Sequence, residues 1–383
     1  MDDRSLIAAV GATISVPKQA PADSFVLHAP LELLARAGLL PRVRPEARDG
    51  ARDQIRALGE KYAAAGDPVE SPVTIEIGSI DDGVTRLIAA LEAGDLDDVD
   101  RLAQWVGTHV TPAQLQHALA QPIAASLAAA AHGSILLDLL PRVALANRVD
   151  ATIVRGPARE LARYPGWRLR WFDDPSDDVV GSTDLATALL EVPMLGTPGS
   201  DFIFPIMNQA EESGLATKLL SSITSVDPID APDAGRDLAR IAAWSVLQEP
   251  PDYAPYGWSH CLTMPQSVIA LAGQGSDPRT AVAVAATHVV GFRAALGQRV
   301  LDPAAEPESP RVASVWHAPD EALDDIEADL ASGAAQHEDA HLVKYTLACF
   351  DAATHDPTNR RLYLSAATAL HEWWSVDYAA SEK

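Results

Sequence analysis

The sequence contains little cysteine and little positive charge. Its two cysteines, Cys261 and Cys349, form no CxxC pair, which excludes zinc-finger and thioredoxin-type motifs. Both lie in apolar helical context, so we expect reduced core thiols in a cytoplasmic protein. Lysine and arginine number 29 against 53 aspartate and glutamate residues, which gives a net charge of −24. Nucleic acids and anionic membranes bind basic surfaces, so neither is an expected partner.

Long apolar runs and several common enzyme motifs are also missing. The most apolar stretch, 118–140, is interrupted by Gln121, Pro122, His132 and Asp138, whereas a membrane-spanning helix needs roughly 20 apolar residues. The first residues are acidic rather than basic, so no secretory signal is expected. No GxGxxG follows a predicted strand and no GxSxG occurs. A Rossmann site for flavin or nicotinamide and a serine hydrolase are therefore not predicted.

Helical periodicity dominates the rest of the sequence. It predicts a mostly α fold: a single large helical domain in two halves, 20–150 and 233–375, with an irregular cover segment at 151–232. Thr111-Pro112 and Asp97-Asp98 are typical helix starts. Short β-favouring or irregular pieces rich in proline and glycine fill 151–210. The predicted helices span 29–37, 45–65, 82–92, 96–107, 111–131, 135–147, 234–247, 262–272, 281–296, 319–331, 338–353 and 358–373.

One lysine contradicts the pattern around it. EDAHLVKYTLACFDAA (338–353) is apolar on nearly every face, which indicates a buried helix, yet His341 and Lys344 share one face of it. A buried ammonium is costly unless it is paired, deprotonated or chemically altered. Lys344 could pair with Asp339 or Asp351, or extend to solvent. Alternatively, a neutral amine beside His341 could react with carbon dioxide, and the carbamate would supply an anionic oxygen ligand.

Histidines recur in apolar helices. His28, His132, His260 and His341 each stand at or near the start of such a helix, and His288 lies within another. A single histidine of this kind is more simply interpreted as a core residue satisfied by hydrogen bonds. Several unpaired imidazoles in one interior would be costly, however, and helix bundles build metal sites from inward side chains. We therefore predict that the first four bind a metal ion, with His288 as a further candidate.

The other histidines and the flanking carboxylates are expected at the surface. His337 is predicted at a solvated helix start, and Glu32 and Asp138 are predicted to be exposed. The usual iron triad of two histidines and one carboxylate is therefore not evident. The remaining histidines expected at the surface are His109, His117, His317, His355 and His371.

The chain resembles the questin oxidase-like family, the flavin-free oxygenases of aromatic polyketide pathways. The resemblance covers about 20–375 and rests on four stretches: VLHAP, AAHGSILLDLLPRV, WSHCLTMPQSVIAL, and DAHLVKYTLACFDAA followed by YLSAATALHEWW. This chain is shorter than the fungal members, and its first histidine stands alone. The resemblance implies O₂-dependent oxidation of a polycyclic aromatic ketone or quinone, by Baeyer–Villiger-type insertion or ring cleavage. The matching site residues are His28, His132, His260, His341 and Lys344.

Oxygen chemistry without an organic cofactor needs a redox metal or a substrate that donates an electron itself. We therefore expect Fe(II) at the histidines, completed by carbamylated Lys344, with Lys344 and His341 in the catalytic role. Trp258, Phe202 and Phe204 are candidates for an apolar substrate pocket. Two other interpretations stay open. The same donors would serve a zinc or nickel hydrolase, or the histidines could be core residues of a non-catalytic helical binding protein.

Overall fold

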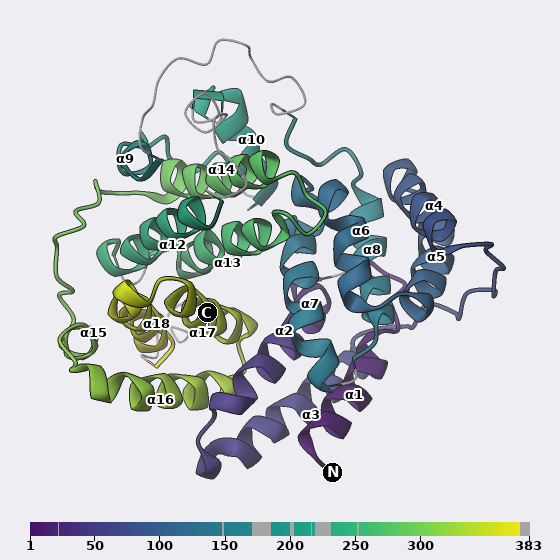
Figure 1. Ribbon diagram of the computed structural model, residues 1–383, viewed down its shortest axis with the longest axis horizontal. Coiled ribbons are helices and arrows are strands. Elements are labelled where there is room, and N and C mark those ends of the chain that lie inside the picture. The colour runs from purple at the N-terminus through teal and green to yellow at the C-terminus, as the bar shows by residue number, and fades with distance from the viewer. Residues whose placement is uncertain are drawn as a thin grey trace.

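The chain folds as an assembly of packed helices (Figure 1). The computed structural model describes residues 1–21, 23–147, 149–170, 185–199, 203–215, 217–218, 231–250 and 253–375. Within these ranges there are 17 α-helices, joined by loops and short 3₁₀ turns, and β-pairing is limited to three isolated bridges. The prediction of a mostly α protein is confirmed. No helix in the described ranges is both long and apolar enough to cross a membrane.

The first half begins several helices where the sequence predicts them. Thr111 caps α6 in a capping box with Gln114, and the Asp95 side chain caps α5. The predicted helix 111–131 is wrong in its length, because α6 ends at Ala124 and a separate 3₁₀ turn follows. The helices of this half are α1 (Asp3–Ile14), α2 (Ser24–Leu39), α3 (Arg48–Ala64), α4 (Ile80–Ala93), α5 (Leu96–His109), α6 (Pro112–Ala124) and α7 (Gly133–Asn147).

The middle segment is more helical than the sequence predicts. ATIVRG, expected to be β-favouring or irregular, forms the 3₁₀ turn η4 (Ala151–Val154) and the start of α8 (Arg155–Arg163). Tertiary contacts override the local preference here, because both Nε and Nη2 of Arg155 donate to the carboxylate of Asp100 on α5, each at 3.0 Å. Two further helices follow, α9 (Leu185–Leu190) and α10 (Ile203–Glu212).

Helices of the two halves meet in the centre of the molecule. From the first half, α2 packs against both α7 and α17, and α13 of the second half packs against α7, α12, α14 and α17. Helix α14 is buried from Ala281 to Leu296, as expected for a helix that is apolar all round. The second half consists of α12 (Ala231–Gln248), α13 (Pro255–Leu271), α14 (Pro278–Leu296), α15 (Pro310–Trp316), α16 (Leu323–Gln336), α17 (Ala340–His355) and α18 (Arg360–Ser375).

Three polar residues expected at the surface are buried instead. Glu32 and Asp138 are only 5% and 6% exposed. Each can be buried because an arginine one turn later neutralises it: Arg36 lies 2.6 Å from Glu32, and Arg142 lies 2.9 Å from Asp138.

The other departure is His371, which is buried with its Nε2 3.0 Å from the hydroxyl of Thr346. His337 is half-buried rather than fully solvated. The histidines that are exposed as predicted are His109, His117, His317 and His355.

Candidate metal centre

Four of the predicted histidines meet where α2, α7, α13 and α17 converge. His28 lies in α2, His132 directly precedes α7, and His260 and His341 lie in α13 and α17. The ring centroid of His28 is 4.6 Å from that of His132 and 4.5 Å from that of His341. The ring of His260 lies 5.2 Å from His132 and 5.1 Å from His341. The structure therefore brings together imidazoles that are far apart in the sequence.

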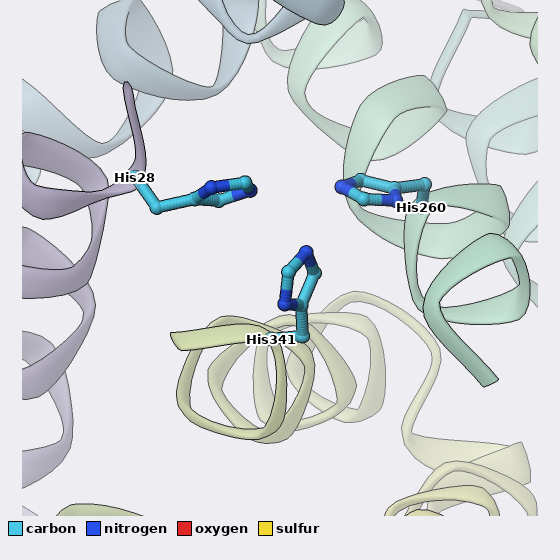
Figure 2. A group of neighbouring side chains, drawn as sticks. All are labelled: His28, His260 and His341. Carbon is cyan, nitrogen blue, oxygen red and sulfur yellow. The ribbon is translucent and has the colours of Figure 1, made fainter. Parts of the chain in front are cut away.

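The nitrogens of three of these rings face a common centre, and His132 adjoins this group through His260. Figure 2 shows His28, His260 and His341 pointing toward one another from three different helices, and one nitrogen of each lies within 4.8 Å of the others. The Nε2 atom of His132 lies 3.3 Å from Nε2 of His260. Two nitrogens bound to a tetrahedral ion at the usual 2.0–2.1 Å are about 3.3 Å apart. This pair already has the spacing that coordination requires.

In His28 and His341, Nδ1 forms a hydrogen bond on the side of the ring away from the centre, so Nε2 is the nitrogen available to a metal ion. Nδ1 of His28 donates to the carbonyl of Ser24, and Nδ1 of His341 donates to Oδ1 of Asp339 at 3.0 Å. The Nε2 atom of His28 is buried and has no hydrogen-bond partner among the described residues. Metal-binding histidines characteristically donate their second ring N–H to a carbonyl or carboxylate in this way. The donor set therefore fits a metal ion.

The three residues directly before His132 have left-handed backbone conformations, which set the position of this histidine. Ala129, Ala130 and Ala131 have φ values of 51°, 50° and 57°, and Nδ1 of His132 donates to the carbonyl of Ala130 at 2.7 Å. Within the described residues the only other non-glycine residue with positive φ is Ala254, at 52°, directly before α13. Ala130 and Ala254 line the same cavity as the histidines. Strained backbone is thus concentrated at this site, as is common at functional sites.

The site keeps its histidines neutral. Burial is the main cause that holds the pKa values of His28, His132 and His260 well below the ordinary value, and the positive charge of Lys344 lowers them further. Burial also lowers the pKa of His341, although its hydrogen bond to a carboxylate opposes the shift. Neutral imidazole is the form that binds metal ions.

Lys344 is buried beside this group, and no described carboxylate forms an ion pair with it. It is 4% exposed, and its Nζ makes no hydrogen bond or ion pair within the described residues. Asp351 binds Arg142 at 2.6 Å, and Asp339 binds His341, so neither expected partner reaches the lysine. The alternatives of salt-bridge pairing and of extension to solvent are therefore wrong. Burial lowers the pKa of Lys344 to about 7, so a substantial fraction of the amine is neutral near physiological pH.

A cavity of about 920 Å³ opens beside the four histidines. Its wall includes Tyr164, Trp167 and Phe204, whose rings form a continuous stack. The centroids of Tyr164 and Trp167 are 4.3 Å apart, and those of Trp167 and Phe204 are 4.6 Å apart, with interplanar angles of 21° and 18°. Phe204 lines the cavity as predicted, although it lies in helix α10 rather than in a loop. Phe202 lies outside the described residues.

Trp258 does not line this cavity, and its selection as a pocket residue is wrong. It borders a separate hollow with Tyr253 and Leu370. The reason is helical geometry: residues two positions apart in a helix point in nearly opposite directions, so Trp258 faces away when His260 faces the centre. Tyr256, which lines the cavity and was not predicted, is four residues before His260 and shares its face. Its hydroxyl donates to Oδ2 of Asp339 at 3.2 Å.

His288 stands apart from the other histidines. It is 1% exposed in α14, its Nδ1 has no hydrogen-bond partner among the described residues, and burial lowers its pKa to about 4. It is outside the group of described nitrogens that could share an ion and, unlike His132, its ring contacts none of the other four histidines. The structure therefore separates His288 from the site.

No family model matches the chain, and no curated protein or solved structure is detectably similar to it. The questin oxidase-like family therefore remains a resemblance of sequence motifs, and function has to be argued from the site itself.

Proposed function

We propose that this protein is a metal-dependent oxygenase, with Fe(II) as its metal, that oxidises a polycyclic aromatic ketone or quinone. One observation carries the proposal: four neutral imidazoles converge in the interior and face a cavity with a wall of stacked aromatic rings. Neutral imidazole suits iron among other metals, and no organic cofactor is required at such a site. The resemblance to the questin oxidase-like family points to the same class of reaction.

The four histidines would hold the ion through the nitrogens that face the centre. When bound, Fe(II) supplies one-electron chemistry with O₂. Asp339 fixes the ring of His341, because its carboxylate accepts the Nδ1 proton and leaves Nε2 as the donor atom. Lys344 would provide the one anionic ligand as a carbamate, because its neutral amine can form an N–C bond to carbon dioxide and release one proton, which leaves an anionic oxygen donor. Carbamylation would also remove the cost of burying an ammonium ion.

The cavity would orient the substrate and exclude water. Its volume of about 920 Å³ accommodates a polycyclic molecule. The stack of Tyr164, Trp167 and Phe204 offers a flat apolar wall, onto which a planar ring system can add as a further layer. Binding in this orientation would hold one edge of the substrate toward the histidines.

Metal analysis tests the proposal directly. Protein purified under anaerobic conditions and reconstituted with Fe(II) should retain about one equivalent of iron after desalting. Addition of a hydroxylated anthraquinone, with and without an electron donor such as ascorbate, should then consume O₂ and produce a product with increased oxygen content, measured with an oxygen electrode and by mass spectrometry in ¹⁸O₂. Stoichiometric iron without any O₂ consumption across a panel of such quinones would refute the oxygenase.

A zinc or nickel hydrolase is the second candidate. The separation of 3.3 Å between the nitrogens of His132 and His260 also matches tetrahedral zinc. Preferential retention of zinc together with ester or amide hydrolysis would favour this activity. Absence of any tightly bound metal in a fully folded protein would instead favour a non-catalytic binding protein.

A further inference from the structure

A second cavity of about 560 Å³ lies away from the histidines, against later residues of the same helices. Asp138 of α7 is six residues beyond His132, and Asp351 of α17 is ten residues beyond His341. At 1.5 Å per residue these positions are about 9–15 Å further along their helices. We call this hollow the distal cavity; its wall includes Gln116, Asp138, Pro141, Arg142, Ile269 and Asp351. It shares no lining residue with the histidine cavity.

The fixed charges of the distal cavity are unequal. Arg142 donates to Asp138 at 2.9 Å and to Asp351 at 2.6 Å, so one guanidinium serves two carboxylates. A second arginine in the wall, Arg236, is paired with Asp233 on its own helix. With both carboxyls ionised, the group of Asp138, Asp351 and Arg142 carries one negative charge in excess, while the third carboxylate of the wall, Asp356, pairs with Arg240 at 2.7 Å.

Two buried polar groups of the distal cavity are incompletely hydrogen-bonded: Asp138 accepts only from Arg142 among the described residues, and Gln116 accepts from none. Asp138 is 6% exposed, and burial raises its pKa to about 7 although Arg142 opposes the shift. Gln116 is 8% exposed, and its side-chain amide makes no hydrogen bond within the described residues. Buried polar groups are costly when they stay unpaired, so both would gain from a ligand that donates hydrogen bonds.

Part of the remaining wall is apolar, although Gln266, Gln274 and His355 also line it. Pro141, Ile269, Ala270 and Ala352 border the hollow, and they offer contact to a hydrocarbon body rather than to a hydrated ion. A bare metal ion or a water cluster would leave this surface unused, whereas a cation with an apolar body would cover it.

We propose that the distal cavity binds a small organic cation, with its ammonium nitrogen donating to Asp138 and Asp351 and its apolar body against Ile269 and Pro141. The amide oxygen of Gln116 is a third acceptor for the same nitrogen or for a neighbouring donor of the ligand. This site does not depend on the metal or on the oxygenase activity proposed above.

Binding of benzylamine, which is protonated at neutral pH, tests the proposal. Benzyl alcohol and benzoate serve as neutral and anionic probes of similar shape. Metal-free protein prepared with a chelator is used, so that the amine cannot ligate an ion at the histidines. Isothermal titration calorimetry should show saturable binding of benzylamine, binding of benzyl alcohol weaker by about tenfold or more, and none of benzoate. Equal affinity for the three probes, or no saturation by benzylamine up to about 10 mM, would overturn the proposal.

Benzylamine binding by substituted proteins tests whether the amine occupies the distal cavity. Asp138→Asn should weaken benzylamine binding by about tenfold or more, and Ile269→Trp should block it by filling the hollow. Asp81→Asn removes the same charge from an exposed position and should bind as the wild type does. His260→Ala should also bind normally, because the histidine cavity is separate. If Asp138→Asn does not fold, Asp351→Asn takes its place, since the Asp351 side chain is more exposed at 14%. Undiminished binding in both the carboxylate variant and Ile269→Trp would contradict the proposal.

Discussion

Helices α7, α13 and α17 border two very different polar interiors. Beside their earlier residues, His132, His260 and His341 gather as neutral bases. Beside their later residues, Asp138 and Asp351 gather as acids around a shared arginine. Both groups are largely removed from water, but only the second contains its own counter-charge.

The difference shows two ways of placing polar groups inside one helical core. Neutral imidazoles cost less to desolvate than ions, but together they present lone pairs that a metal ion or hydrogen-bond donors must satisfy. Ion pairs cost more to bury and largely neutralise each other, so they leave a small surplus of charge. The histidine group is therefore suited to the metal ion proposed above, and the distal cavity to the proposed monovalent organic cation.

The strongest test of this contrast compares two buried histidines. His260→Ala should reduce bound metal from about one equivalent to less than a tenth, because it removes a ligand from the centre. His288→Ala removes an equally buried imidazole outside the centre and should retain the metal. Metal content after desalting is measured by inductively coupled plasma mass spectrometry. Equal metal loss in the two variants would show that burial, rather than ligation, explains the effect.

The next largest effect is expected at Lys344. If Lys344 carries the proposed carbamate, Lys344→Ala should weaken metal binding by about 10- to 100-fold, because the variant lacks that anionic donor. Helix content by circular dichroism should stay nearly unchanged. The matched control is Lys61→Ala, since Lys61 is exposed and stacks on Phe25 at 4.2 Å, away from the site.

Bicarbonate sharpens this prediction about Lys344. Added bicarbonate should raise the metal affinity of the wild type and of Lys61→Ala, but not that of Lys344→Ala. Full metal retention in Lys344→Ala would remove the carbamate from the proposed site.

A third test concerns the pH dependence of stability at Asp138. Its pKa of about 7 in the fold lies above the ordinary 3.8, so the native state binds more protons than the unfolded state between about pH 4 and 7. Stability contributed by this carboxyl therefore falls as pH rises through that window. Relative to Asp138→Asn, the wild type should lose roughly 1–4 kcal/mol of unfolding free energy between pH 4 and pH 8. Urea unfolding at several pH values measures the difference, and Asp81→Asn should show no such trend.

The smallest effect is expected at the aromatic wall. Phe204→Leu should weaken the binding of a planar probe such as naphthoquinone by about three- to tenfold, because one ring of the stack is lost. Phe25→Leu alters a phenylalanine that does not line the cavity and should leave affinity unchanged. Quenching of tryptophan fluorescence reports both affinities. A planar probe that binds both variants equally well would place its site elsewhere.

The meeting of the four histidines could be predicted because their sequence context is unusual. An imidazole buried in an apolar helix is costly. Repetition of that arrangement at His28, His132, His260 and His341 therefore predicted that the four rings lie together at one site. The burial of Asp138 was missed although a signal existed: Arg142 follows it at the spacing of one helical turn, which is the pattern of a paired carboxylate.

Other parts of the site could not be read from the sequence. Trp258 is close to His260 in the chain but faces away from it, because neighbours in a helix do not share a direction. The stack of Tyr164, Trp167 and Phe204 joins residues from α8, the loop after it and α10. Contacts of this kind depend on tertiary packing, which short-range periodicity does not encode.

The left-handed turn at Ala129–Ala131 has a consequence for how the protein matures. Each alanine in this conformation costs about 1–2 kcal/mol, so the newly made chain rarely presents His132 in its final place. Packing of α7, α8 and α10 around the turn has to supply that energy. The fourth imidazole thus reaches its position only after these helices have assembled, so the proposed metal site is complete only once the chain has folded.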